Sequence, residues 1–289
     1  MNSAIVIEAW ANRAVAEDAE GRLIAFHLPR RLARPLPGQS INLNANDELA
    51  EVIPHRNQFG RGDPRGRFKP IAVNLDQAVV VIAPEPAPSP NLIHRYIAAS
   101  LICGIEPIVV VNKSDLSHPD QPPFSDLKQL RSLGYRVIET RCKPNPEIDE
   151  LRDLLGNKTN LIAGQSGVGK TSLVNALIPD VERQTGALSK VTGKGTHTTT
   201  SARLCRLPSD GWLVDTPGVW EYGLWTMPKN RLIKGFPEFA EHADQCRFRD
   251  CSHAHEPRCA VRSAAERGEI MDFRYQAWLR LLDEQDRIA

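Results

Sequence analysis

The segment that most constrains the fold of this 289-residue chain is the run 164–171, G-Q-S-G-V-G-K-T, which fits the pattern G-x4-G-K-[ST]. An apolar run predicted to be a strand precedes it, and a helical pattern follows it. Glycines allow successive backbone N–H groups to curve around a phosphate, and the helix N-terminus adds partial positive charge. We therefore predict a nucleoside phosphate site formed by Gly164, Gln165, Ser166, Gly167, Val168, Gly169, Lys170, Thr171 and Ser172. In such a loop, Lys170 bonds the terminal phosphates and Thr171 holds Mg²⁺.

The apolar pattern around this loop predicts an α/β P-loop domain. From residue 71 on, apolar β-type runs alternate with amphipathic helical patterns. Such alternation is typical of a mostly parallel sheet covered by helices on both faces. The expected strands are 71–83, 107–111, 135–139, 160–164, 201–207 and 211–215.

The two ends of the chain have different patterns. Short β-type runs separated by Gly, Pro, Asn and Asp predict a small antiparallel barrel at the N-terminus. The stretch 59–70, F-G-R-G-D-P-R-G-R-F-K-P, is rich in Gly and Arg and predicts a mobile linker or loop. Near the C-terminus, 266–285 has apolar residues at helical spacing and predicts a helix that packs on its own domain. The predicted units are a β-barrel at 1–68, the nucleotide domain at 69–225 and a helical module at 226–289.

Two further segments are predicted to reach the terminal phosphate. The strand 211–215 ends in Asp215, whose carboxylate can hold a metal-bound water, and Gly218 leaves room for its N–H to approach a γ-phosphate. The intervening run 193–200, G-K-G-T-H-T-T-T, can order around that phosphate and offer a hydroxyl to the metal. The predicted metal-binding threonine is Thr199, with Thr198 and Thr200 as alternatives.

A second motif, N-K-S-D, follows the apolar strand 107–111 directly. A carboxylate that accepts hydrogen bonds from guanine N1–H and the exocyclic amine makes a match that adenine lacks. We predict this role for Asp115, a bond to the other base edge for Asn112, and stacking of the Lys113 stem on the ring. Ser114 or Asp115 can at the same time cap a helix. The motif predicts a guanine nucleotide, GTP or GDP, rather than ATP.

The order of the motifs is unusual. In the common Ras-like order the guanine motif follows the phosphate loop, whereas here it precedes both that loop and Asp215. The same sheet forms if its strands are circularly permuted, because the connections run over the surface. Asp215 then lies near the exit of the domain, next to the C-terminal module.

A cluster of cysteines and histidine in the C-terminal module predicts a metal site. Cys246, Cys251, His253 and Cys259 offer three thiolates and one imidazole, which suit structural Zn²⁺. The alternatives for the imidazole are His255 and His242. The remaining cysteines are scattered singly and are predicted to be small buried hydrophobic residues: Cys103, Cys142 and Cys205.

Charge is balanced overall but not locally. The chain has 36 Lys and Arg against 35 Asp and Glu, yet residues 21–70 have nine basic residues against four acidic ones. A solvated loop explains such an excess, but we favour contacts with RNA phosphates. The candidate contacts are Arg30, Arg31, Arg61, Arg65 and Arg67. No apolar run has the roughly 18 residues of a membrane span, and the first residues lack a secretion-signal pattern, so we expect a cytoplasmic protein.

These motifs, in this order, closely resemble the ribosome small-subunit-dependent GTPase (RsgA) family. The resemblance covers essentially the whole chain and includes H-T-T-T at 197–200 and D-T-P-G at 215–218, followed by G-L-W. It implies an N-terminal OB-fold, a zinc-binding module, GTP hydrolysis stimulated by the small (30S) ribosomal subunit, and a role in late maturation of that subunit. Two positions differ: Thr140-Arg-Cys142 replaces a Ser-Ala-like pair that commonly touches guanine, and Gln39 replaces an acidic residue.

Hydrolysis of a γ-phosphate requires a positioned water and stabilisation of charge. Lys170, Mg²⁺ and the backbone amides of the loop supply the stabilisation of charge. The glutamine that commonly follows D-x-x-G is absent, because Val219 stands there. We predict that His197 orients the water, as the resemblance also implies; a purely structural role in its loop is the alternative.

The main hypothesis is therefore a monomeric GTPase that binds the small subunit and its rRNA. The alternative is a nucleotide-gated RNA or protein assembly module in which hydrolysis is incidental. A P-loop kinase or ATPase is a third interpretation, against which the N-K-S-D motif argues.

Overall fold

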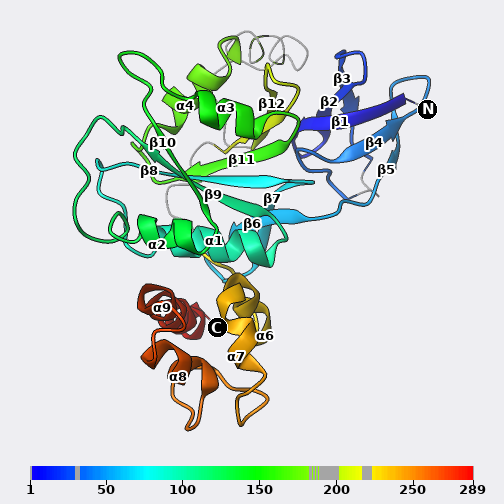
Figure 1. The fold of residues 1–289 in the computed structure, drawn as a ribbon. Coiled ribbons are helices and arrows are strands. Elements are labelled where there is room, and N and C mark those ends of the chain that lie inside the picture. Colours follow the sequence, from blue (N-terminus) through cyan, green and yellow to red (C-terminus); the bar gives the residue numbers. More distant parts are fainter. Residues whose placement is uncertain are drawn as a thin grey trace.

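The molecule has three parts, an N-terminal antiparallel sheet, a central α/β domain and a helical C-terminal module (Figure 1). The structure is a computed structural model that describes residues 2–29, 33–181, 184, 186, 188, 202–216 and 223–288. The N-terminal sheet lies beside one edge of the central sheet, and the C-terminal module lies against helix α1 (Leu92–Ile102).

The N-terminal sheet has five antiparallel strands in the order β3-β2-β1-β4-β5. They are β1 (Asn2–Ala9), β2 (Arg13–Asp18), β3 (Leu23–His27), β4 (Ser40–Leu43) and β5 (Leu49–Val52). Small and branched apolar side chains, among them Val6, Ala16 and Ile41, form its buried core. With β1 paired to both β2 and β4, this is the strand order of an OB-fold, and the expected barrel-type fold is confirmed.

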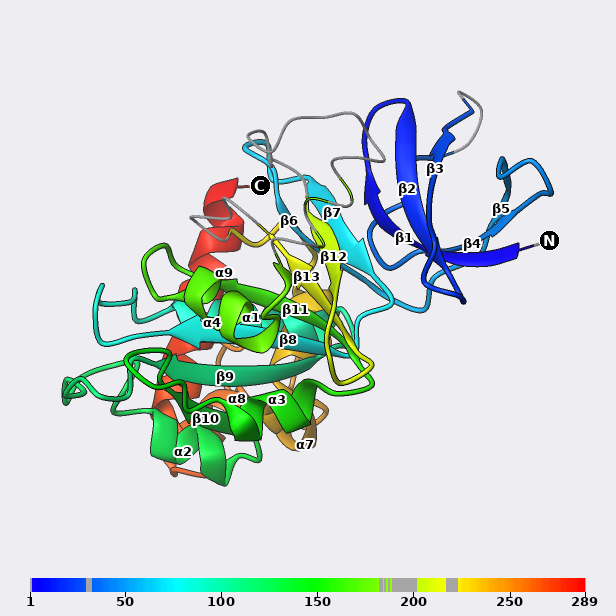
Figure 2. The same ribbon diagram turned by 90° about the horizontal axis from the view of Figure 1, so that it is seen from above.

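Residues 59–70 form part of a hairpin, so the prediction of a mobile linker is wrong. Strand β6 (Gln58–Gly62) pairs antiparallel with β7 (Phe68–Val73). The glycines serve close backbone approach rather than flexibility, because a Cβ on Gly60 would lie 2.5 Å from the Lys69 carbonyl oxygen. Figure 2 shows the hairpin near the C-terminal end of the last helix.

The central sheet has six strands in the order β10-β9-β8-β11-β13-β12. They are β8 (Gln77–Ile82), β9 (Glu106–Asn112), β10 (Arg136–Thr140), β11 (Thr159–Gly164), β12 (Arg203–Arg206) and β13 (Trp212–Asp215). All pairs are parallel except β12 with β13, in agreement with the predicted mostly parallel sheet. The single strand expected at 71–83 is divided into β7 and β8, because Asn74 adopts a left-handed φ of 57° between them.

Helices cover both faces of this sheet, as the alternating pattern predicted (Figure 1). Helices α3 (Asp149–Leu155) and α4 (Lys170–Leu177) pack on one face, over alternate side chains of β8, β9 and β11. Helix α1 and α2 (Leu127–Ser132) pack on the other face. The strands are thus buried on both sides, which accounts for their continuous apolar sequence.

All the regular elements of the C-terminal module are helices in its described residues. Its elements are α6 (Lys229–Leu232), η1 (Ile233–Gly235), η2 (Pro237–Phe239), α7 (Ala240–Ala243), α8 (Ala260–Glu266) and α9 (Asp272–Ile288). The Trp278 ring lies 5.3 Å from that of Phe236 and 5.6 Å from that of Phe239, and all three are buried. Across these elements, no helix combines the length and apolar character needed to cross a membrane.

Helix α9 packs on the central domain as well as on its own module, which extends the sequence prediction. One hydrophobic core runs from α1 into the module without interruption. A Cβ on Gly235 would lie 2.7 Å from the Cα of Ala98, so η1 rests directly on α1. The module is therefore docked on the nucleotide domain rather than tethered to it.

A buried arginine strengthens this junction. Arg274 of α9 is 0% exposed; its guanidinium pairs with the Glu238 carboxylate and donates to the Gly235 carbonyl oxygen at 3.0 Å. It also lies 4.5 Å from the centroid of the Phe236 ring. A buried guanidinium requires such partners, so these contacts determine the position of α9 relative to η1 and η2.

The same junction contains a buried histidine of α1. The Nδ1 of His94 lies 3.3 Å from an Arg274 nitrogen, and its Nε2 lies 3.8 Å from the Asp126 carboxylate. Burial lowers the pKa of His94, and the positive charges of Arg274 and Arg280 act in the same direction, whereas Asp126 opposes them. The folded protein therefore favours neutral His94.

Candidate nucleotide and metal sites

The phosphate loop runs from the end of β11 to the start of α4, as predicted. Gly164 and Gly169 have backbone φ values of 143° and 95°, which residues with a side chain rarely adopt. A Cβ on Gly169 would lie 2.2 Å from Asn112 Nδ2. Lys170 Nζ donates to the carbonyl oxygens of Gly164 and Gln165, both at 2.7 Å. The ammonium group is thus held against the loop, where terminal phosphates would be its ionic partners.

The loop residues on either side of Lys170 differ in exposure. Thr171 is exposed in the first turn of α4, and Ser172 is half-buried beside it. Val168 is fully buried and attaches the loop to the core under α4. The exposed Thr171 hydroxyl is available to a metal ion.

The guanine motif is tied to the phosphate loop by Asn112. This side chain is 2% exposed at the end of β9. Its Nδ2 donates to the Val168 carbonyl oxygen at 2.8 Å, and its Oδ1 accepts from Thr140 Oγ1 at 3.2 Å. Both ends of the amide are therefore engaged within the protein, and the bond from Asn112 to the base stays a prediction.

The rest of the motif is open to a ligand. Asp115 is exposed, and Lys113 adopts a left-handed φ of 60° while its Nζ donates to the Glu85 carbonyl oxygen at 2.6 Å. The alternative role as a helix cap is wrong, because the next helix, α2, begins only at Leu127. The positions of Lys113 and Asp115 are compatible with binding a guanine.

Thr140 and Cys142, which depart from the family pattern, lie against the guanine motif. In the structure Cys142 Sγ lies 3.6 Å from Asn112 Oδ1, beside the Thr140 bond. The backbone N–H of Ser114 donates to the Thr140 carbonyl oxygen at 3.1 Å. These residues fix the guanine motif, a role that no local pattern could reveal, since β9 and β10 are brought together by the sheet. Cys142 is only half-buried, so it is not the simple core residue that was predicted.

Asp215 and Lys170 form the charged centre of the site. Burial raises the pKa of Asp215, while the nearby Arg203 and Lys170 oppose that shift. Burial lowers the pKa of Lys170, and Asp215 opposes it. Each charge is therefore only partly compensated, which suits a pair that acts on an anionic phosphate and a divalent cation.

Five residues predicted for the terminal-phosphate and metal site lie outside the described residues. They are His197, Thr198, Thr199, Thr200 and Gly218. Their roles stay predictions.

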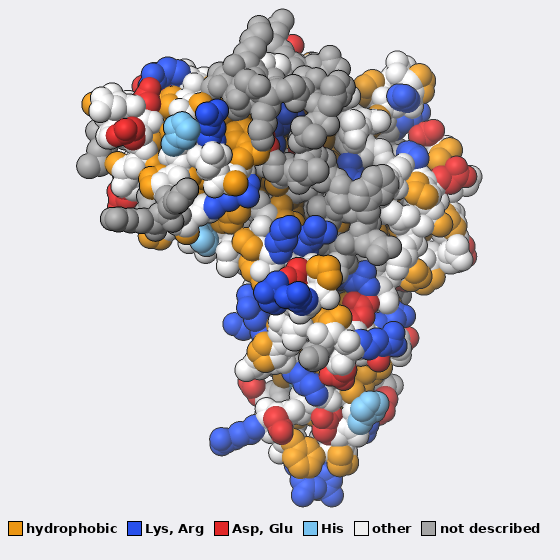
Figure 3. All heavy atoms as spheres, turned by 180° about the vertical axis from the view of Figure 1, so that it is seen from behind, with side chains coloured by type: hydrophobic (Ala, Val, Ile, Leu, Met, Phe, Trp, Pro, Cys, Tyr) orange, Lys and Arg blue, Asp and Glu red, His pale blue; other side chains and the backbone are white. Residues whose placement is uncertain are grey.

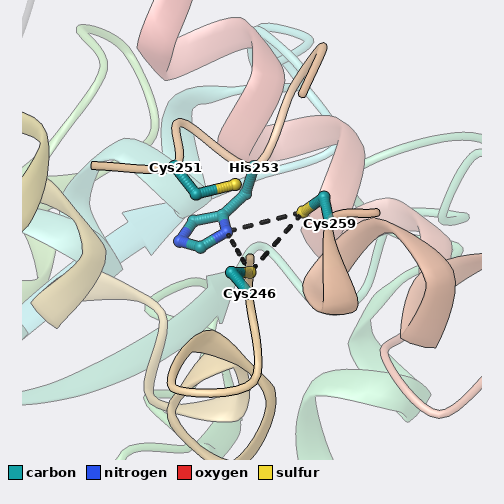
Figure 4. A group of neighbouring side chains, drawn as sticks. All are labelled: Cys246, Cys251, His253 and Cys259. Atoms are coloured by element: carbon teal, nitrogen blue, oxygen red, sulfur yellow. Dashed lines mark hydrogen bonds between the residues drawn. The ribbon is translucent and has the colours of Figure 1, made fainter. Parts of the chain in front are cut away.

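The metal-ligand prediction brings four side chains together. The ligand atoms of Cys246, Cys251, His253 and Cys259 all lie within 4.8 Å of one another (Figure 4). His253 Nδ1 lies 3.5 Å from Cys246 Sγ and 3.6 Å from Cys259 Sγ, and those two sulfurs are 4.0 Å apart. A tetrahedron with zinc–sulfur bonds of about 2.3 Å has edges of about 3.6–3.8 Å. The donor set fits one metal ion.

The geometry also selects among the histidines. His255 is exposed and lies outside this group, and His242 lies 3.9 Å from the Glu269 carboxylate instead. Neighbouring contacts hold the ligand loop in place: Tyr275 Oη donates to the His253 carbonyl oxygen at 2.9 Å, and Trp278 Nε1 to the Ser252 carbonyl oxygen at 3.0 Å. The ligand loop is thus fixed by α9.

The predicted phosphate-contacting arginines have different surroundings. Arg67 is paired with Asp63, whereas Arg65 is exposed at the hairpin turn and Arg61 is half-buried. Arg30 and Arg31 lie outside the described residues. Figure 3 shows Lys and Arg side chains gathered where the C-terminal module meets the rest of the molecule.

The predicted motifs meet at one edge of the central sheet. The phosphate loop follows β11, Asp215 ends β13 and the N-K-S-D motif begins at the end of β9, all at the carboxyl ends of parallel strands. Ligands of open α/β sheets bind at this edge. With the guanine motif before the phosphate loop in the chain, this arrangement defines a circularly permuted P-loop GTPase.

Comparison with known proteins identifies the family. A model of the RsgA GTPase family matches residues 52–225, and the chain belongs to that family. A relative from Pseudomonas aeruginosa, named small ribosomal subunit biogenesis GTPase RsgA, is 41% identical over 283 residues, which are 96% of this chain and 84% of the relative. A relative of the same name from Hahella chejuensis is 44% identical over 275 residues, with coverage of 92% and 79%.

Solved structures agree with this assignment. YjeQ from Thermotoga maritima is 28% identical, with a TM-score of 0.76 over 98% of each chain. YloQ, described as a circularly permuted GTPase, is 27% identical, with a TM-score of 0.75 over 100% of this chain and 96% of its own. The predicted family, fold class and GTP-hydrolysing activity are confirmed.

Proposed function

We propose that this GTPase acts in late maturation of the small (30S) ribosomal subunit, binds that subunit and its rRNA, and hydrolyses GTP faster when bound. The observation behind the proposal is the extent of the similarity. Relatives named for small-subunit biogenesis match 96% of the chain, so the N-terminal sheet and the Cys/His module are included with the nucleotide domain. The protein is proposed to act as a cytoplasmic monomer.

The N-terminal sheet is the proposed RNA-binding part. OB-type sheets bind nucleic acids through one face and its loops. Outside this sheet, exposed Arg65 in the β6–β7 turn and the basic surface at the junction with the C-terminal module in Figure 3 supply further positive charge for RNA phosphates. Arg30 and Arg31 are proposed to contribute in the same way.

Within the nucleotide site, the following roles are proposed. Lys170 binds the terminal phosphates, Asp115 recognises guanine, and Thr171, Thr199 and Asp215 hold Mg²⁺, with Asp215 acting through a water. The only partly compensated charge of Asp215 and the exposed Thr171 fit such a cation. When bound, Mg²⁺ neutralises charge on the phosphate oxygens. His197 orients the attacking water.

The metal held by the Cys/His cluster is proposed to be one structural Zn²⁺. Three thiolates and an imidazole at tetrahedral spacing are the ligands that zinc prefers, and together they fill all four positions of a closed structural site. Its role is to hold together a ligand loop with little core of its own.

Co-sedimentation tests the ribosomal role. The chain is mixed with purified small or large subunits in the presence of GDP or a non-hydrolysable GTP analogue, and GTP turnover is measured with and without small subunits. We expect association with small subunits in the GTP-like state, and stimulated turnover. Association without stimulation would favour the assembly module with incidental hydrolysis, and no association would refute the ribosomal role.

A second experiment tests His197. The variant His197→Ala is expected to bind GTP with unchanged affinity and to lose most of its turnover on small subunits. Unchanged turnover would remove His197 from the mechanism.

A further inference from the structure

The β6–β7 hairpin is fixed against the chain that leaves the nucleotide site. The Gly62 N–H donates to the Gly223 carbonyl oxygen at 3.0 Å, and the Thr226 N–H donates to the Gly66 carbonyl oxygen at 2.7 Å. A Cβ on Gly62 would lie 2.6 Å from the Leu224 carbonyl oxygen, so the two backbones are in close contact. Side chains on this hairpin therefore have a defined position relative to the nucleotide domain.

Two cations face each other across the hairpin. Arg61 of β6 and Lys69 of β7 are direct partners in the register, so their side chains leave the same face of the ribbon. Like charges directly opposite each other are unfavourable. Within the ranges that the structure describes, neither has an acidic partner within ion-pair distance. An anion between them would relieve the repulsion.

The acidic side chains nearby are already engaged. Arg61 and Lys69 line a cavity of about 1030 Å³ together with Asp63 and Glu284. The Asp63 carboxylate is paired with Arg67, and its Oδ1 accepts two backbone N–H groups of the turn. The Glu284 carboxylate is paired with Arg95. The cavity thus has two uncompensated positive charges.

The phosphate loop lines the same cavity. Gln165 and Ser166 line it, as does Gly223 of the segment paired with the hairpin. Lys170 Nζ donates a hydrogen bond to the Gln165 carbonyl oxygen. In loops of this kind the lysine binds the terminal phosphates. The cavity therefore borders the end of the nucleotide site where the terminal phosphate lies.

We propose that Arg61 and Lys69 are a cation pair, supplied by the chain itself, that contacts the terminal phosphate of GTP during hydrolysis. In this reaction the water oxygen forms a bond to the γ-phosphorus, the bond from that phosphorus to the β–γ bridging oxygen breaks, and its electron pair stays on GDP. The water protons pass to the released phosphate and solvent. Arg61 and Lys69 neutralise the negative charge of the oxygens on the transferred group. This assigns Arg61 to the nucleotide, whereas its sequence pattern suggested RNA.

The test uses Arg61→Gln and Lys69→Gln in the full chain, without ribosomes, so that it is independent of the ribosomal role. Each variant keeps a polar, shorter side chain and loses the charge. We expect kcat for intrinsic GTP hydrolysis to fall by about tenfold or more in Arg61→Gln, by less in Lys69→Gln, and by most in the double variant. Binding of GDP, measured by calorimetry, is expected to change less than twofold, which also shows that the variants are folded.

Two further variants sharpen the result. Arg61→Lys keeps a positive charge and is expected to recover part of kcat. Arg13→Gln removes an exposed arginine from a strand of the N-terminal sheet and is expected to leave intrinsic kcat unchanged. Unchanged kcat in the Arg61 and Lys69 double variant would overturn the proposal. If that variant instead lost only its co-sedimentation with small subunits, the pair would be an RNA contact, and the proposal would equally be wrong.

Discussion

Replacement of Arg274 by alanine is expected to loosen the C-terminal module from the nucleotide domain. Arg274 is 0% exposed, and the side chain of its partner Glu238 is only 14% exposed. The variant Arg274→Ala leaves this carboxylate without its cation and the Gly235 carbonyl oxygen without its donor. Removal of one partner of a buried ion pair costs about 3–5 kcal/mol. Since Glu238 keeps some solvent contact, we expect a loss of about 3 kcal/mol.

This loss is measurable by urea denaturation. The buried Trp225 and Trp278 report on the junction and the module through their fluorescence. With a denaturant slope of about 3 kcal/mol/M, the midpoint is expected to fall by roughly 1 M urea. The matched control is Arg287→Ala on the same helix, which breaks an exposed pair with Asp283 and is expected to shift stability by less than about 0.5 kcal/mol.

A double variant separates the buried charge from the packing. Arg274→Met with Glu238→Gln removes both charges and keeps most of the volume, so we expect it to recover much of the lost stability. If Arg274→Ala shifted the midpoint no more than Arg287→Ala, the reasoning that the buried pair fixes the module would be refuted. A double variant as unstable as Arg274→Ala would refute the assignment of the loss to an unpaired charge.

Four other expectations follow from the structure. Gly169→Ala is expected to weaken GDP binding by tenfold or more in calorimetry, because a Cβ there would collide with the guanine motif. Since folding lowers the pKa of His94, the unfolded chain binds more protons below about pH 6.5, and stability should fall as pH decreases from that value; urea titrations at several pH values should show a smaller decrease in His94→Gln. Cys259→Ser is expected to abolish bound zinc, measured by mass spectrometry of the metal content, whereas Cys103→Ser retains it. Asp115→Asn is expected to shift nucleotide preference from guanine towards xanthine nucleotides in competition binding.

The parts of the fold that the sequence predicted depend on local patterns. The phosphate loop, the alternation of strands and helices and the Cys/His cluster each lie within a short stretch, so spacing alone identifies them. Cys246 and His253, for example, lie only seven residues apart in the chain, and their ligand atoms lie close together in the structure. GTPase function followed from two such motifs.

The errors concern features that depend on distant segments. The hairpin at 59–70 resembled a linker because Gly62 is needed against Leu224, more than 150 residues away, and that contact leaves no trace in local composition. The strand expected at 71–83 looked continuous because a left-handed turn at Asn74 has no apolar signature. The buried partners of Arg274 and the contact of Cys142 with the guanine motif likewise arise only when separate elements pack together.

The strand order of the central sheet bears on how the chain is synthesised. The first strand of that sheet to leave the ribosome, β8, occupies an interior position between β9 and β11. The next two strands extend one side of it, and β11 then adds to the other side. The last two strands, β12 and β13, are antiparallel neighbours that add as one hairpin next to β11. No strand of the described sheet therefore has to enter between two that are already paired, and this permuted domain can assemble outward from its centre in the order of translation.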